Sequence, residues 1–187
     1  MKAIVFLAAI VILLGSFYSS SLLAQTPTVQ IYFDEALQVK HRRCPDAQPG
    51  TIQDTLYIVA HNFNAQIIDI EYLFHTYGNM VYYGDLLPAG YTAIGFSVDG
   101  IVVSFPAPVY AGSTFLIQGV MFWWTCRGCP EPDYLIWIEP HPTSGKVQAT
   151  RWPDLGKIEG MGRFSYLCPP VPVEQKTWGG IKALYRQ

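Results

Sequence analysis

Two groups of residues in this sequence have types and spacings that could support chemistry. Cys126 and Cys129 have the Cys-x-x-Cys spacing of a dithiol redox pair, in which a low-pKa thiolate attacks a disulfide. Asp69, Glu71 and His75 lie at odd positions of one alternating segment, so in a strand they share one face. Carboxylates beside an imidazole can bind a metal ion or transfer protons.

The four cysteines are better explained as structural. Redox pairs usually lie at the start of a helix, whereas Pro130 follows Cys129 here in a loop, and no second Cys-x-x-Cys completes a zinc ribbon. We expect a short loop closed by Cys126–Cys129, and a Cys44–Cys168 bond if the first and last strands lie side by side and parallel. Four cysteines allow three pairings, and the sequence does not choose among them.

The Asp69, Glu71 and His75 face is interpreted as an ordinary solvated outer face, because one strand rarely supplies a complete site. A second carboxylate or histidine within about 4 Å of Glu71 or His75 would instead favour a metal or hydrolase site. The segment Gly95–Asp99 lacks the last glycine of a nucleophile elbow, and the histidines lack His-x-x-x-His spacing. The sequence therefore predicts no catalytic residue, no metal and no cofactor.

Aromatic residues offer a possible contact surface. Trp123 and Trp124 must point to opposite faces of a strand, so at least one of them belongs to the core. Trp152 ends a strand and is the better candidate for exposure, although packing in the core or loops competes with ligand binding for every tryptophan. The hypothetical binding surface consists of Arg151, Trp152, Trp178 and Tyr185.

Short strands must position these residues. In Ile68–His75, apolar side chains alternate with polar ones, which is the pattern of a half-buried strand. Proline-containing segments such as Pro106–Pro108 mark loops, and no helical stripe of ten residues precedes residue 170. We predict an all-β, antiparallel β-sandwich domain over residues 25–168. The other expected strands are Val29–Phe33, Thr55–Asn62, Met80–Tyr83, Tyr91–Ser97, Ile101–Phe105, Phe115–Trp124, Tyr134–Glu139, Val147–Trp152 and Phe164–Leu167.

Composition and the N-terminus indicate an exported protein. Half of the 187 residues are hydrophobic, which argues against disorder, and 12 Lys+Arg against 14 Asp+Glu give no basic footprint for nucleic acid. Lys2 precedes the apolar run Ala3–Leu14, which is shorter than the roughly 20 residues that span a bilayer. We expect residues 1–24 to be a cleaved signal peptide, leading to a secreted, extracellular or periplasmic location without a transmembrane segment in the mature chain.

Residues 169–187 differ in character from the rest. A proline-rich tether precedes Thr177, which can cap a short helix, and Trp178, Ile181 and Tyr185 would form its apolar stripe. So short a helix is marginal in water, so we expect this tail to dock on its own domain, with anchoring elsewhere as the alternative.

The order of the expected strands supports a family resemblance. The runs Asp54–Asn62, Ile70–Tyr72, Gly84–Pro88, Gly100–Phe105 and Phe115–Phe122 resemble cohesin-like, immunoglobulin-like sandwiches of bacterial secreted proteins. The resemblance implies a jelly-roll of about nine strands that binds a partner protein or a polysaccharide at the cell surface. It carries over no functional residue. The chain equally resembles other exported bacterial proteins of this size.

The first functional hypothesis is therefore a secreted or cell-surface module for binding, adhesion or structure, and not an enzyme. The alternative is a secreted enzyme. It would be a thiol oxidoreductase that uses Cys126 and Cys129, or a hydrolase or metal site on the Asp69, Glu71 and His75 face.

Overall fold

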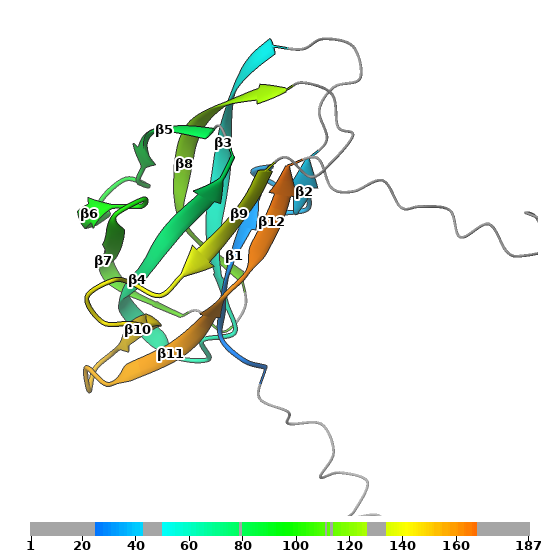
Figure 1. The fold of residues 1–187 in the computed structure, drawn as a ribbon. Helices are drawn as coiled ribbons and strands as arrows, with labels where there is room; N and C mark the ends of the chain where they lie inside the picture. The colour runs from blue at the N-terminus through cyan, green and yellow to red at the C-terminus, as the bar shows by residue number, and fades with distance from the viewer. Residues whose placement is uncertain are drawn as a thin grey trace, which may run out of the picture.

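A computed structural model describes residues 25–42, 50–78, 80–110, 112, 114–126 and 134–167 of the chain. Within these residues every regular element is a strand, so the expected all-β class is confirmed (Figure 1). The strands are β1 (Thr28–Tyr32), β2 (His41–Arg42), β3 (Gly50–His61), β4 (Gln66–Tyr77), β5 (Met80–Leu86), β6 (Thr92–Phe96), β7 (Gly100–Tyr110), β8 (Thr114–Cys126), β9 (Tyr134–Glu139), β10 (Val147–Arg151), β11 (Lys157–Gly162) and β12 (Phe164–Leu167).

Several expectations fall outside the described residues. They are the signal peptide over residues 1–24, the cysteines Cys44, Cys129 and Cys168, and the tail over residues 169–187 with its helix, Trp178 and Tyr185. Cys126 ends β8, where its backbone pairs with Gly50, but its side chain is also outside the description.

The twelve strands form one hydrogen-bonded path, β2-β12-β9-β4-β10-β11-β1-β3-β8-β5, with β7 paired to β4 and β6 paired to β7. The expectation of purely antiparallel pairing is wrong at two places. β1 is parallel to β11, and β2 is parallel to β12. Parallel neighbours need a long crossover, and almost the whole domain lies between these partners in the sequence. The count of about nine strands is also exceeded, because β2 and β11 carry no clear alternation of their own.

β9 and β10 act as one interrupted strand beside β4. β9 pairs with Leu73–Tyr77 and β10 pairs with the preceding half of β4, both antiparallel. Between them the segment Pro140–Lys146 leaves the sheet as a loop, closed by a 2.9 Å hydrogen bond from His141 N to Lys146 O. β11 and β12 follow the same break, because β11 pairs with β10 and β12 pairs with β9 (Figure 1).

The core follows the alternation that the sequence predicted. Ile70, Tyr72 and Phe74 of β4 are buried, and they belong to a single apolar cluster with side chains of β1, β3, β7, β8, β9 and β10. Trp124 is 1% exposed and lies in this cluster, whereas Trp123 is 36% exposed on the other face of β8. The expectation that one of these two tryptophans is a core residue is confirmed.

The expected loop at Pro106–Pro108 lies inside β7. Between the pairs Asp69–Ser104 and Ile67–Val109, β4 advances by two residues while β7 advances by five. The strand therefore bulges at its prolines, which cannot donate to a ladder but do not need to where the register is interrupted.

Candidate functional site

The polar face of β4 forms the centre of a broad outer surface. Residues opposite one another in an antiparallel pair point to the same face. Asp69 and Glu71 lie opposite Thr150 and Gln148 of β10, and His75 lies opposite Trp137 of β9. The structure thus places the three residues on one face, as the alternation predicted, but it surrounds them with partners that the sequence did not indicate.

Asp69 and Glu71 are held by β10 and β11. Thr150 Oγ1 donates to Asp69 Oδ1 at 2.5 Å, and Gln148 Nε2 donates to Glu71 Oε1. Lys157 Nζ donates to Thr150 Oγ1 at 2.7 Å and lies 3.6 Å from Glu71 Oε1. Glu71 is only 8% exposed, so the expectation of a simple solvated face is wrong there. The neighbouring loop Pro140–Lys146 brings His141 Nδ1 to 3.8 Å from Glu71 Oε2.

His141 and Glu71 do not form an acid–base dyad. The His141 Nδ1 to Glu71 Oε2 distance of 3.8 Å is too long for a hydrogen bond. His141 Nδ1 accepts a hydrogen bond from Thr143 N at 3.3 Å, so it presents no proton to the carboxylate. The separation meets the limit of about 4 Å that would favour a hydrolase, but Glu71 Oε1 is already bonded to Gln148 and His141 Nδ1 is bonded to Thr143 N.

A second cluster lies two outer positions further along β4. The His75 imidazole stacks on the Trp137 indole, with centroids 4.4 Å apart and planes 11° from parallel. His75 Nδ1 lies 3.1 Å from Glu139 Oε2, and Trp137 Nε1 donates to Glu139 Oε1 at 2.5 Å. Four residues of strand separate His75 from Glu71 by about 13 Å, so the two clusters are distinct. Within the described ranges, no group of three or more His, Cys, Asp or Glu side chains is suited to a metal ion.

The margins of this outer surface are apolar. At one margin, Ile94 and Phe96 of the edge strand β6 lie opposite Val102 and Gly100 of β7 and are 77% and 60% exposed. At the other margin, the exposed Phe164 of β12 lies opposite Trp137. Sequence reasoning did not find these residues, because the exposure of an apolar residue on a strand depends on which strands flank it. We call Ile94, Phe96, His75, Trp137 and Phe164, with the polar residues between them, the outer face.

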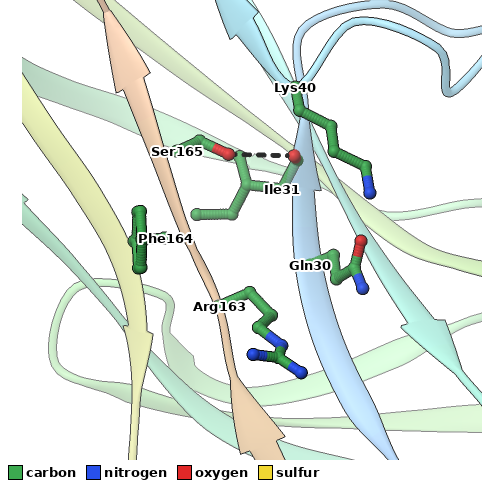
Figure 2. A pocket seen from close by; sticks show the side chains of 6 residues that line it. All are labelled: Gln30, Ile31, Lys40, Arg163, Phe164 and Ser165. Atoms are coloured by element: carbon green, nitrogen blue, oxygen red, sulfur yellow. Dashed lines mark hydrogen bonds between the residues drawn. The ribbon is translucent and has the colours of Figure 1, made fainter. Parts of the chain in front are cut away.

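A groove of about 340 Å³ lies beside this surface, between β1 and β12. It is lined by Gln30, Ile31, Lys40, Arg163, Phe164 and Ser165 (Figure 2). A second hollow of about 380 Å³ lies on the β9 side of β12, where Leu135, Trp137 and Ile138 join Gly162, Arg163 and Phe164. Sequence analysis had no signal for either one, since both arise where two strands separate.

The surface that the aromatics suggested is only partly described. Arg151 and Trp152 are exposed at the end of β10, and Arg151 Nε donates to Asp154 Oδ1 at 2.8 Å. The hydrogen bonding between these two side chains raises the pKa of Arg151 and lowers the pKa of Asp154. The structure brings Arg151 together with Asp154, and it brings neither Arg151 nor Trp152 together with the outer-face clusters.

Comparison with known proteins places the fold. No protein-family model matches the sequence, and no curated protein matches it. A type III cohesin module from the cellulosomal ScaE cell-surface anchoring scaffoldin of Ruminococcus flavefaciens superposes with a TM-score of 0.51 at 8% identity, over 78% of this chain and 88% of that chain. A chain of the complex between a CaDoc0917 variant and CaCohA2 gives a TM-score of 0.50 at 8% identity, over 76% of this chain and 99% of that chain.

The chain therefore has a cohesin-like fold, as its strand order predicted. A further solved structure, the third ScaB cohesin of R. flavefaciens in complex with a group 1 dockerin, has a TM-score of 0.47 at 12% identity over 77% of this chain and 96% of that chain. No helix in the described part of the chain is long and apolar enough to cross a membrane.

Proposed function

We propose that this chain is a non-enzymatic, exported module that binds a partner protein through its outer face. The observation that carries the proposal is the division of that face. Its polar centre is bonded within the protein, while Ile94 and Phe96 at one margin and Phe164 at the other remain open to solvent. Protein contact surfaces have apolar cores and polar rims, so each apolar margin supplies the core of a contact and the polar centre supplies its rim.

The state of the polar groups supports binding over catalysis. A general acid or base needs a free position from which to reach a substrate. Gln148 and Lys157 occupy one carboxylate oxygen of Glu71, and Glu139 is shared between His75 and Trp137. A hydrolase at this face is the alternative function, and the distances of 3.8 Å and 3.1 Å from histidine to carboxylate are what favour it.

Secretion and surface location belong to the same proposal. The signal-like segment over residues 1–24 supports export, and four cysteines in the remaining chain suit an oxidising compartment. One solved neighbour of the fold is a module of a cell-surface anchoring scaffoldin. We also propose a two-layered jelly-roll arrangement, which is supported by one apolar cluster that joins β3 and β8 to β4 and β7.

The experiment is an affinity pull-down in which the mature chain, residues 25–187, captures proteins from its own cell-envelope fraction. The double variant Ile94→Ser/Phe96→Ser removes one apolar margin. Its matched control is Val81→Ser/Tyr83→Ser, which removes side chains of similar exposure, 64% and 65%, from β5. We expect the first variant to lose the captured protein and the control to retain it, with both giving the wild-type circular-dichroism spectrum.

Three results would contradict the proposal. One is equal capture by both variants, and another is capture of envelope polysaccharide without protein. The third is steady hydrolysis of a substrate that stops in Glu71→Gln or His75→Gln, which would establish the alternative. Repeating the capture with residues 170–187 deleted tests the tail separately. Unfolding of the truncated chain indicates docking on its own domain, and a folded chain that loses surface retention indicates an anchor.

A further inference from the structure

The groove between β1 and β12 opens at Arg163, where the chain leaves its pairing with β1 and continues as β12 beside β9. The parallel pairing of β1 with β11 includes Val29 beside Gly162, and Arg163 N donates to Val29 O at 3.0 Å. The Arg163 carbonyl already turns the other way, since it accepts a hydrogen bond from Ile138 N of β9 at 3.1 Å. Beyond this point, Ser165 Oγ reaches back to Ile31 O at 3.1 Å and spans the opening (Figure 2).

The groove is cationic, and the described residues that line it include no acid. Lys40 and Arg163 line it together with the Gln30 amide, and the other lining residues are uncharged. Figure 2 shows the three polar side chains in a row, with Gln30 between the two cations. The ion pairs found among the described residues involve neither Lys40 nor Arg163. Two such cations beside an amide donor are suited to carboxylates.

The charge of Lys40 acts on its surroundings. Lys40 Nζ lies 5.5 Å from the centroid of the Tyr32 ring. The pKa of His61 is lowered, chiefly by burial and secondly by the positive charge of Lys40. His61 Nε2 is in turn 3.2 Å from the Tyr32 hydroxyl. The ammonium group of Lys40 therefore lies beside β1, where it contributes positive charge to the groove.

The hollow on the other side of β12 is mainly apolar, unlike the cationic groove. Leu135, Trp137, Ile138 and Phe164 give it a mainly apolar lining, and it shares Arg163 and Phe164 with the cationic groove. A ligand that crosses β12 at these two adjacent residues meets a cationic site and an apolar site within a short distance. Both volumes, about 340 and 380 Å³, are at the small end of the range for ligand sites and suit a few side chains.

Charge argues against the chain's own tail as the occupant. Residues 168–187 contain Lys176, Lys182 and Arg186 against the single acid Glu174, so this segment is repelled by Lys40 and Arg163. The charge of the groove suits an acidic occupant, and we assign this occupant to another molecule. An extended peptide can present a carboxylate to this groove and an apolar side chain to the adjacent hollow.

We propose that this groove binds an extended acidic peptide of a partner protein, in which a Glu or Asp residue adjoins an aromatic or aliphatic residue. The carboxylate lies between Lys40 and Arg163, and the apolar side chain enters the hollow of Trp137 and Phe164. The inference rests on the proposed function only in that the partner is a protein, since the groove does not include Ile94 or Phe96.

The test uses the peptide acetyl-Glu-Phe-Glu-amide, titrated into the isotopically labelled mature chain and followed by NMR. We expect saturable shifts of the Arg163 Nε–H and Gln30 side-chain amide signals, with a dissociation constant for the peptide of about 1 mM or below. The matched neutral peptide acetyl-Gln-Phe-Gln-amide should bind about tenfold more weakly, and so should the acidic peptide in 1 M NaCl.

Variants assign the binding to the groove. Arg163→Gln and Lys40→Gln should each weaken the acidic peptide about tenfold, whereas Lys146→Gln removes the same charge from an exposed pair with Glu159 and should change affinity less than about twofold. Phe164→Ala should weaken acetyl-Glu-Phe-Glu-amide but leave acetyl-Glu-Gly-Glu-amide unchanged.

The proposal is overturned by equal binding of the acidic and neutral peptides, or by equal loss in all three charge variants. It is also overturned if oligogalacturonate saturates the same signals while the peptide does not, since the ligand would then be an acidic polysaccharide. If Arg163→Gln still captures the envelope partner and the acidic peptide does not bind, peptide binding in the groove is refuted, while the proposed function is unaffected.

Discussion

Pro142 packs so closely on Gly100 that a Cβ added at residue 100 would lie 2.5 Å from Pro142 Cδ. The same Cβ would lie 3.1 Å from His141 Cδ2. Gly100 also has a φ of +103°, a backbone conformation that favours glycine. This contact joins the start of β7 to the loop Pro140–Lys146, which is the loop that brings His141 near Glu71.

Gly100→Ala should therefore lower the free energy of unfolding by about 3 kcal/mol, because steric overlap with Pro142 adds to the backbone strain. The matched control is Gly145→Ala in the same loop. Gly145 has a φ of +67° but no described atom within 4 Å of a Cβ, so only the backbone term of about 1 kcal/mol applies. Urea denaturation measures both variants. Equal losses would mean that the contact between Gly100 and Pro142 contributes nothing to stability.

A polar cluster ties β5 to the turn before β7. The Asp85 carboxylate accepts hydrogen bonds from Ser97 N at 3.0 Å and Tyr82 Oη at 2.7 Å, and from Gln118 Nε2 at 3.2 Å. The side chain of Ser97 also accepts a hydrogen bond from Gln118, and both residues are fully buried. The pKa of the Tyr82 hydroxyl is raised above its ordinary value by burial and by its bond to Asp85.

Asp85→Ala should destabilise the protein by about 3 kcal/mol, because it leaves the buried Ser97 N–H without an acceptor and removes one of the two acceptors of Gln118 Nε2. Tyr82→Phe removes one donor and leaves the acceptor with its other bonds, so it should cost about 1 kcal/mol. Both variants are compared by urea denaturation at pH 7. A loss below about 1 kcal/mol in Asp85→Ala would show that water replaces the carboxylate at this position.

Alternation within one strand predicted the inward side chains Ile70, Tyr72 and Phe74 and the shared outer face of Asp69 and His75. It could not predict the burial of Glu71, because a loop more than sixty residues away in the sequence closes on it. The same limit applies to the groove at Arg163. Local patterns determine which way a side chain points, and long-range pairing determines what it meets.

Pro106 and Pro108 predicted a loop because proline cannot donate to a ladder, but the bulge between β4 and β7 accommodates both of them. The short strand β2 was missed because two residues cannot display a period, and β11 was missed because glycines interrupt its alternation. The resemblance to cohesin-like sandwiches depended on the order of the longer strands. It was confirmed because those strands were placed correctly.

His61 gives a pH-dependent prediction. Its pKa is lowered from 6.5 by burial first and by Lys40 second. The His61 imidazole therefore binds a proton more readily in the unfolded chain, where its pKa is about 6.5, than in the folded chain. The free energy of unfolding should fall as the pH falls through about 6.5. Lys40→Gln should raise the pKa of His61 in an NMR titration but leave it below 6.5, since burial remains.

The control for this titration is Lys146→Gln, which removes a cation that is paired with Glu159. It should leave the His61 curve unchanged. His61→Gln should flatten the dependence of stability on pH across the same window. A His61 pKa that is identical in the Lys40→Gln variant and the wild type would show that burial alone shifts this histidine.

The register of β12 and β2 leads to a prediction about the cysteines. Tyr166 lies beside His41 and Leu167 beside Arg42 in a parallel pair, so the chain leaves both strands at the same edge. Cys168 is the next residue after Leu167, and Cys44 is the second after Arg42. We predict a Cys44–Cys168 disulfide, with Cys126–Cys129 closing the short loop that follows β8. Non-reducing peptide mapping of the exported protein should recover both cross-links.

The two bonds should differ in their effect on stability. Cys44→Ser/Cys168→Ser opens a loop that contains most of the domain and should cost about 4 kcal/mol in urea denaturation, by the entropy that a cross-link removes from the unfolded chain. Cys126→Ser/Cys129→Ser opens only a four-residue loop, so its cost should be far smaller. If Cys126 and Cys129 are instead recovered as alkylatable thiols after export, the dithiol redox hypothesis regains its support, because a structural pair would have been oxidised in that compartment.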